Sequence, residues 1–145
     1  MKNKAFDFDK RHKSRTYLIV DDKLALNDEI VVLGYFSLTM KSLELGETLS
    51  KSTIKRIDGF SKDVQATEAI LLGQFGKNEN YSDDIEGQLM LKFVIDIVYS
   101  IHDLAGGRII FLECDEIPKL IDFYTRNGFE PLQKSGDYLQ MIRYL

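Results

Sequence analysis

The stretch GGRIIFLECDEIPKLIDFYTRNGF, residues 106–129, decides the fold of this chain. Its two glycines end the segment before it, and the branched apolar run at residues 109–112 predicts a short buried strand. Pro118 suits the first turn of a helix, where a residue without an N–H is tolerated, and the apolar residues after it recur at helical spacing. Gly128 is a natural helix end. The stretch therefore predicts a strand, an acidic connection and a short helix.

Outside this stretch, the hydrophobic patterns predict four further strands. They are expected at residues 16–20, 30–41, 67–76 and 137–145, and the first two should form an antiparallel hairpin. Gly34, inside the second strand, indicates a bulge or a close approach of another backbone segment. The strand at 67–76 is expected to lie parallel to the strand at 109–112, with a right-handed helical crossover between them.

Two further helices are predicted. A short one should begin after the cap Ser50, run through Ile57 and stop at Gly59. A long one should begin at Gln88 and end at Gly106. The buried stripe of the long helix is expected to consist of Met90, Phe93, Val94, Ile97, Ile101 and Leu104.

Composition bounds the class of protein. A chain of 145 residues fits one domain, and its net charge of -4 disfavours nonspecific nucleic-acid binding. The single cysteine, Cys114, excludes an internal disulfide and fits a reducing compartment. The charged N-terminus does not resemble a secretory signal, no stretch approaches the roughly 18 apolar residues of a membrane span, and no metal-ligand spacing of Cys and His occurs. A cytoplasmic protein without a membrane partner or a bound metal is expected.

The end of the short helix, Phe123-Tyr124-x-x-x-Gly128-Phe129, with the strand before it, resembles the C-terminal half of the GNAT superfamily of N-acetyltransferases. This resemblance implies an α/β fold with a central mixed β-sheet flanked by helices, the GNAT-like acyl-CoA N-acyltransferase fold, as a single domain over residues 1–145. The family places a strand and two helices before the first hairpin. Only 15 residues precede Thr16, so the domain is expected to lack the usual first strand and helix.

The resemblance also implies acetyl-CoA as the acyl donor and direct attack by an amine acceptor in a ternary complex. The pyrophosphate would lie at the start of the long helix, where free N–H groups and the helix dipole favour an anion. The family's Q/R-x-x-G-x-G/A loop aligns on Gly87, but here it begins with Asp84 and ends with Leu89. Together with Asp83 and Glu86, Asp84 would repel a pyrophosphate unless these carboxylates point away. Without a ligand, the same acids would stabilise the helix dipole.

Site residues are carried over from the family by position. The cofactor-binding residues are expected to be Leu72, Gln74, Phe75, Lys77, Asn78, Glu86, Gly87 and Gln88. A backbone N–H of Gln74 or Phe75 would polarise the thioester carbonyl. Tyr124 matches the tyrosine that gives a proton to the departing CoA thiolate, although a structural, half-buried tyrosine would look the same. Glu113 and Glu68 are candidates for the general base, acting through water, or else simply solvated strand-end acids.

Two functions of different class are compatible with these features. The first is an N-acetyltransferase whose acceptor could be a small amine, an antibiotic, a protein N-terminus, a lysine or a charged tRNA. The second is a non-catalytic CoA-binding or protein-interaction module that retains the GNAT fold. In either case a shortened sheet leaves an edge to cover, which predicts self-association, most simply as a homodimer.

Overall fold

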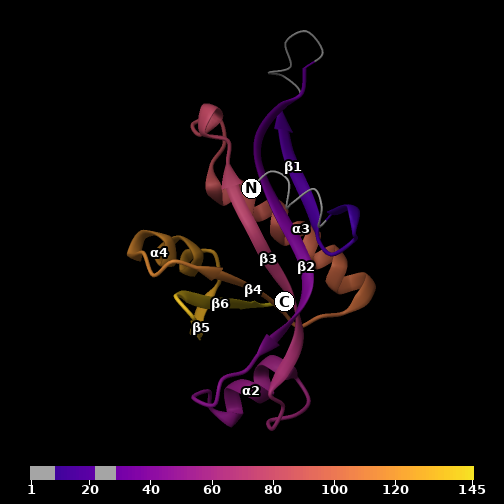
Figure 1. Ribbon diagram of the computed structural model, residues 1–145, viewed down its shortest axis with the longest axis vertical. Coiled ribbons are helices and arrows are strands. Elements are labelled where there is room, and N and C mark those ends of the chain that lie inside the picture. Colours follow the sequence, from indigo (N-terminus) through magenta and orange to yellow (C-terminus); the bar gives the residue numbers. More distant parts are fainter. Residues whose placement is uncertain (1–8, 22–28) are drawn as a thin grey trace. The chain divides into compact units, whose positions relative to one another are not determined.

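The computed structural model describes residues 9–21 and 29–145, and these contain a six-stranded mixed sheet flanked by helices (Figure 1). The strand order is β1-β2-β3-β4-β6-β5. The elements are β1 (Arg15–Asp21), β2 (Val31–Glu44), α2 (Lys51–Asp58), β3 (Ala66–Lys77), the 3-10 turn η1 (Glu79–Tyr81), α3 (Gly87–Ala105), β4 (Ile109–Cys114), α4 (Pro118–Arg126), β5 (Glu130–Ser135) and β6 (Tyr138–Tyr144). The predicted fold class and order of elements are confirmed. Most of the predicted connection between the first two strands, residues 22–28, lies outside the described residues.

The chain divides into two compact units. The first unit contains the described residues up to Thr39 together with Leu72–Ile97. The second unit contains Met40–Leu71 and Val98–Leu145. Among the helices of the described residues, none is both long and apolar enough to cross a membrane.

In the first unit, β1 pairs antiparallel with β2 around an irregularity at Gly34. Ile19 lies opposite Gly34 and Val20 lies opposite Val32, so Leu33 is an extra residue and forms a β-bulge. A Cβ atom on Gly34 would lie 2.6 Å from Met90 Cε and 2.9 Å from the carbonyl oxygen of Gly76. Both explanations of this glycine are therefore confirmed, since a bulge and a close backbone approach meet there.

The buried face of α3 differs from the predicted stripe. Phe93 is 38% exposed and Leu104 is 88% exposed, so both predictions were wrong. The buried residues of this helix are Met90, Leu91, Val94, Ile95 and Val98. Because the helix is apolar around most of its circumference, more than one stripe satisfies the helical period, and packing alone selects one.

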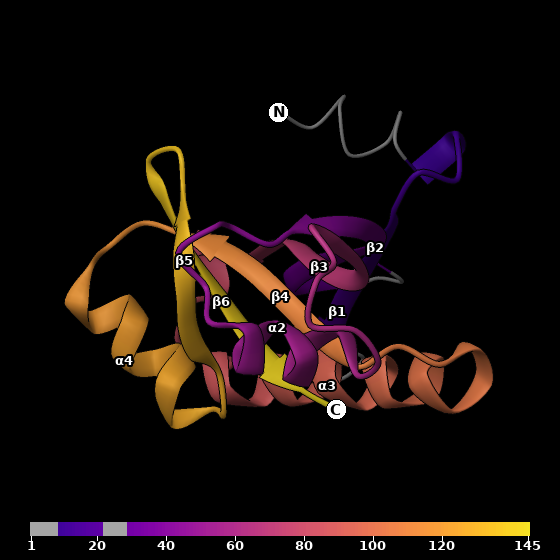
Figure 2. The ribbon, with the colours of Figure 1, turned by 90° about the horizontal axis from the view of Figure 1, so that it is seen from below.

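In the second unit, α2 covers one face of the strands and closes a hydrophobic core (Figure 2). The core residues are Leu43, Leu45, Ile57, Ala69, Ile109, Phe111 and Ile142. The hydroxyl of Ser50 accepts a hydrogen bond from the Thr53 N–H, and Gly59 ends the helix with φ 87°. The predicted cap and stop of this helix are thus confirmed.

The last hairpin contains one strand that no sequence pattern assigned. β5 reads EPLQKS, and it pairs antiparallel with β6, which in turn pairs antiparallel with β4. Its polar residues and Pro131 suit an edge strand, and the strand order places it at the edge of the sheet. α4 lies beside this strand (Figure 1).

Candidate active site

The end of α4 explains the Phe123-Tyr124-x-x-x-Gly128-Phe129 pattern in physical terms. Gly128 adopts φ 85°, its N–H donates to the Thr125 carbonyl at 3.1 Å, and the Phe129 N–H donates to the Tyr124 carbonyl at 3.1 Å. These two bonds define a Schellman motif, which requires a residue in the left-handed region. The rings of Tyr124 and Phe129 pack edge to face at 5.7 Å, which is the apolar contact that accompanies the motif. The pattern therefore fixes where Tyr124 lies.

Tyr124 is a buried phenol. Its side chain is 7% exposed, and it also packs edge to face against Phe123 at 5.1 Å. Burial, and to a smaller extent the negative charge of the nearby Cys114 thiolate, raise the pKa of Tyr124 to about 12. The group consequently keeps its proton throughout the physiological pH range. In this form its hydroxyl is a hydrogen-bond donor.

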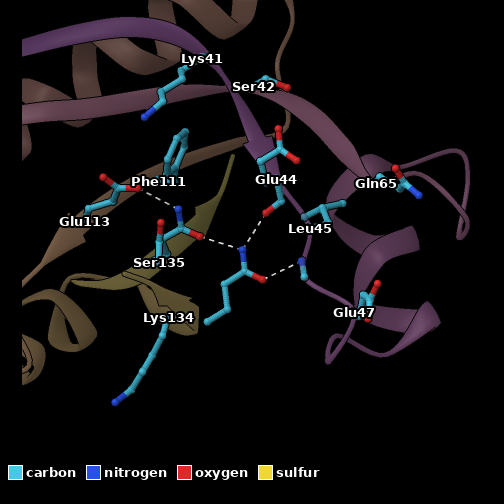
Figure 3. Close-up of a pocket in the computed structure, with 13 residues that line it drawn as sticks. Lys41, Ser42, Glu44, Leu45, Glu47, Gln65, Phe111, Glu113, Lys134 and Ser135 are labelled. Atoms are coloured by element: carbon cyan, nitrogen blue, oxygen red, sulfur yellow. Dashed lines mark hydrogen bonds between the residues drawn. The ribbon is translucent and has the colours of Figure 1, made fainter. Parts of the chain in front are cut away.

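Glu113 lies on the opposite face of β4 from Cys114, because consecutive strand residues point to opposite faces. Its Oε1 accepts a hydrogen bond of 2.9 Å from Gln140 Nε2. Glu113 also lines a pocket of about 480 Å³ in the second unit (Figure 3). The walls of this pocket come from the end of β2 and the segment after it, from β4, and from the β5–β6 hairpin.

The second candidate base, Glu68, lies elsewhere. It is exposed on β3, next to Thr67, whose hydroxyl bonds Asp58 of α2 at 3.2 Å. Consecutive strand residues point to opposite faces, so Glu68 points to the face of the sheet that α2 does not cover. Phe111 and Glu113, in contrast, lie on the face that α2 covers. The structure does not bring the two carboxylates together. Glu113 lines the pocket and Glu68 does not.

The predicted cofactor strand belongs to the first unit. Leu72 is buried, and Phe75 packs against the cluster of Leu33, Ile85 and Met90. The Gln74 N–H donates to the Ser37 hydroxyl of β2 at 3.0 Å, so this donor is engaged within the chain.

Lys77 and Asn78 organise the loop that follows β3. Lys77 Nζ donates to the Ser82 carbonyl at 2.8 Å. Asn78 Nδ2 donates to the Val32 carbonyl at 2.8 Å, and Asn78 Oδ1 accepts from the Asn80 N–H at 3.2 Å. Both side chains therefore hold the loop in shape.

The start of α3 is held by one buried side chain. Ile85 is 5% exposed and packs with Leu33 and Met90, and the helix begins at Gly87. Gln88 and the three carboxylates of this loop are exposed, and Gly87 is half-buried. The first turn of the helix contains no acidic residue, and the first N–H groups of a helix have no partner within the helix. The exposed carboxylates are Asp83, Asp84 and Glu86.

Three polar residues on the strands β2, β5 and β6 were not identified from sequence: Ser37, Gln133 and Gln140. Ser37 and Gln140 are buried, at 8% and 5% exposure, inside otherwise apolar strands. A buried polar residue in such a strand is a usable signal, but its partner depends on strand register, which the sequence does not specify. Over residues 9–21 and 29–145, no cluster of three or more His, Cys, Asp or Glu side chains is arranged to hold a metal.

Comparisons with known proteins give a consistent fold. No protein-family model matches the chain, and a search of curated protein sequences gives no match. A tyrosine mutant of KacT is 21% identical, with 97% of this chain and 76% of that chain covered and a TM-score of 0.73. AtaT complexed with acetyl-methionyl-tRNAfMet is 19% identical, with 99% and 77% covered and a TM-score of 0.72.

A mutant of the AtaT toxin bound to acetyl-CoA and to the C-terminus of the antitoxin AtaR is also similar. It is 16% identical, with 99% of this chain and 75% of that chain covered and a TM-score of 0.70. At such identities the likeness establishes the fold alone. The predicted GNAT-like fold is thereby confirmed.

Proposed function

From the GNAT-like fold that the chain shares with KacT and AtaT, we propose that it is an N-acetyltransferase with acetyl-CoA as the acyl donor. The observation that carries the proposal is Tyr124. Its phenol is buried at the end of α4, its pKa is raised to about 12, and a Schellman motif fixes its backbone. Among the neighbours, an AtaT structure and an AtaTR structure contain acetyl-CoA.

In the proposed reaction, a neutral amine attacks the thioester carbonyl of acetyl-CoA in a ternary complex. The carbonyl becomes an oxyanion, and a backbone N–H of β3 would stabilise it. The C–S bond then breaks. Tyr124 gives its phenolic proton to the departing thiolate, and the proton lost by the attacking nitrogen passes through water to Glu113. The products are the acetamide and CoA.

For the cofactor, we propose that the pyrophosphate lies at the first turn of α3, against the N–H groups that follow Gly87. Glu86 and Gln88 would contribute backbone groups. Leu72 and Phe75 would line the pantetheine, and Lys77 and Asn78 would keep the loop in shape. An exposed carboxylate is free to turn toward solvent, so Asp83 and Asp84 need not face the phosphates.

A non-catalytic module is the second candidate, and a specific observation favours it. Three exposed carboxylates adjoin the would-be phosphate site, where they weaken the binding of an anion. Such a module would retain the fold without transferring an acetyl group, either as a weak CoA binder or as a protein-interaction module that does not bind acetyl-CoA.

The acceptor is proposed to be a primary amine, and the neighbours widen the set of amines to test. One AtaT structure contains acetyl-methionyl-tRNAfMet, and one KacT structure is a complex of KacTA with DNA. Aminoacyl-tRNA therefore belongs in the acceptor panel, even though an acidic chain is poorly suited to nonspecific nucleic-acid binding.

We further propose that the protein is cytoplasmic and forms a homodimer. The single free thiol, Cys114, is stable in a reducing compartment. At the edge strand β1, Leu18 is 60% exposed and Val20 is 49% exposed, and Leu18 lies opposite Tyr35, which is 39% exposed. Such an apolar edge favours a second copy. Light scattering that gives the monomer mass at micromolar concentration would contradict this.

The test of activity is acceptor-dependent release of CoA thiol from acetyl-CoA across the amine panel. Tyr124→Phe keeps the ring and removes the proton, so we expect the rate to fall by about 100-fold or more while the fold is unchanged. Tyr144→Phe is the matched control, because the Tyr144 hydroxyl is buried without a hydrogen-bond partner among the described residues. Equal rates for Tyr124→Phe and wild type would remove Tyr124 from the mechanism.

A further inference from the structure

Three polar side chains form a row across the last three strands of the sheet. Glu113 of β4 lies opposite Gln140 of β6, and Gln140 lies opposite Gln133 of β5. Gln140 Nε2 donates to Glu113 Oε1 at 2.9 Å, and Gln133 Nε2 donates to Gln140 Oε1 at 2.8 Å. The row is continuous, and its central residue is 5% exposed.

A β-bulge creates this row. Pro131 pairs with Met141, but Gln133 pairs with Gln140, so Leu132 is an extra residue in β5. Without the bulge, Leu132 would lie opposite Gln140, and Gln133 would point to the other face. Bulges commonly redirect a side chain in this way beside functional sites.

Two backbone groups set the direction of every hydrogen bond in the row. The Gly46 N–H donates to Gln133 Oε1 at 2.9 Å, and Gln133 Nε2 donates to the Glu44 carbonyl at 2.7 Å. Because an N–H only donates and a carbonyl only accepts, these contacts fix which end of the Gln133 amide is which. Gln133 then presents an N–H to Gln140, so Gln140 must present its own N–H to Glu113. The network thus requires an acceptor at position 113, which a carboxylate supplies (Figure 3).

The pocket beside this row is richer in carboxylates than in available cations. Glu44, Glu47 and Glu113 line it, together with two lysines, Lys41 and Lys134. One of these, Lys134, forms an ion pair of 2.8 Å with Glu116, which does not line the pocket, and extends away from the other labelled side chains (Figure 3). Among the described residues, no hydrogen bond engages Glu113 Oε2.

Apolar surface also lines the pocket. Phe111, two residues before Glu113 on the same face, and Leu45 both contribute to its wall. A ligand with a cationic head and a short hydrocarbon stem would match the carboxylate and this wall together.

We propose that the pocket is a binding site for a primary ammonium group on an apolar stem, that Glu113 receives the ammonium, and that Gln140 and Gln133 are positioning residues that hold Glu113 toward the ligand. The proposal rests on the proposed function only in identifying this ligand with the acceptor amine. The ammonium ion is the resting form of such an acceptor, and it must lose a proton before it attacks.

The test uses n-butylammonium as the probe and 1-butanol as its neutral counterpart. In NMR spectra of the ¹⁵N-labelled full chain, the side-chain NH₂ signals of Gln133 and Gln140 report on the row directly. We expect n-butylammonium to shift the Gln140 signal in a saturable manner and 1-butanol to leave it unchanged. Equal shifts from both probes, or none from n-butylammonium, would overturn the proposal without the need for any variant.

Variants then separate charge from structure. Glu113→Gln should weaken n-butylammonium binding by about tenfold, because a charge-assisted hydrogen bond is lost. Glu47→Gln removes the same charge from the same pocket outside the row, and it should change affinity by less than about threefold. If Glu47→Gln weakens binding as much as Glu113→Gln, only general electrostatics operates and the proposed role of Glu113 is wrong.

An exchange of the two partners tests positioning. In the double variant Glu113→Gln with Gln140→Glu, residue 113 donates to residue 140, which also accepts from Gln133, so the row keeps its hydrogen bonds. We expect a folded protein of lower thermal stability, because position 140 is 5% exposed, and loss of ammonium binding, since the carboxylate no longer projects from position 113. Retained binding would refute the positional requirement. If the double variant does not fold, the probe titration of wild type decides.

Acetyl-CoA titrated into the same samples keeps the two proposals distinguishable. Binding of acetyl-CoA without binding of n-butylammonium would refute the ammonium site and leave the acetyltransferase proposal standing. The reverse result would refute the acetyltransferase proposal and leave the ammonium site standing.

Discussion

At the scale of single residues, Tyr124 uses different atoms for folding and for the proposed chemistry. Its carbonyl and ring belong to the Schellman motif and to the packing against Phe129. Its hydroxyl carries the proton that the proposed reaction needs. A structural account and a catalytic account of this tyrosine are thus compatible, and substitution by phenylalanine separates them because it removes only the hydroxyl.

The raised pKa of Tyr124 predicts a loss of stability at high pH. The pKa is about 12 in the folded chain and about 10 in an unfolded one. Above pH 10 the unfolded state loses this proton while the folded state keeps it, so the free energy of unfolding falls as pH rises from 10 toward 12. The contribution of Tyr124 to this fall is roughly 2–3 kcal/mol, from two pKa units.

Urea denaturation of wild type and Tyr124→Phe between pH 8 and 12 measures this effect. The wild type should lose more stability than the variant over that range, and the difference should appear only above pH 10. A constant difference across the range would mean that the Tyr124 pKa is the same in the folded and unfolded states.

At the scale of elements, local sequence signals predicted the ends of helices well and the buried face of a helix poorly. Ser50, Gly59 and Gly128 act within one turn of chain, and each lies where the sequence indicated. The buried face of α3 depends on packing partners from distant segments, so Phe93 and Leu104 were assigned wrongly. β5 was not assigned because an edge strand needs little apolar surface.

The candidate site also divides into residues that local patterns identify and residues whose position depends on strand register. Glu113 and Tyr124 were identifiable because each follows a local pattern, a strand end and a helix end. Gln133 and Gln140 were not, because their meeting depends on a bulge and on cross-strand register. The Gln74 N–H was a plausible oxyanion donor by position, and its bond to Ser37 depends on how β2 and β3 are aligned.

The helix end after Tyr124 predicts a graded response at Gly128. An alanine there would keep φ near 85° at a cost of about 1–2 kcal/mol, whereas asparagine tolerates that conformation better. Space is not limiting, since the nearest atoms to an added Cβ, on Arg143, are 3.6 Å away. Chemical denaturation should therefore rank wild type above Gly128→Asn and Gly128→Asn above Gly128→Ala.

The opposite order of the two variants would contradict this account of the helix end. Equal stability of all three proteins would mean that the left-handed conformation of residue 128 contributes nothing to the Schellman motif.

At the scale of the whole molecule, the proposed binding of acetyl-CoA has to overcome repulsion between its phosphates and the negative charge of the protein. The chain is acidic overall, with a net charge of -4, and three exposed carboxylates lie in the loop before α3. The helix N-terminus offers N–H groups and a partial positive charge, which favour a phosphate. Because exposed charges are screened and are able to turn away, we expect the fixed N–H groups to dominate.

The most direct test of this claim is calorimetric titration of the purified protein with acetyl-CoA, in wild type and in Gly87→Asp. The variant adds a carboxylate to the first turn of α3, next to the three exposed carboxylates of the preceding loop. Gly136→Asn is the matched control, since it fills open space in the β5–β6 turn. Micromolar binding in wild type and in the control, with at least tenfold weaker binding in Gly87→Asp, is the predicted result. Absence of acetyl-CoA binding in wild type would contradict the acetyltransferase account.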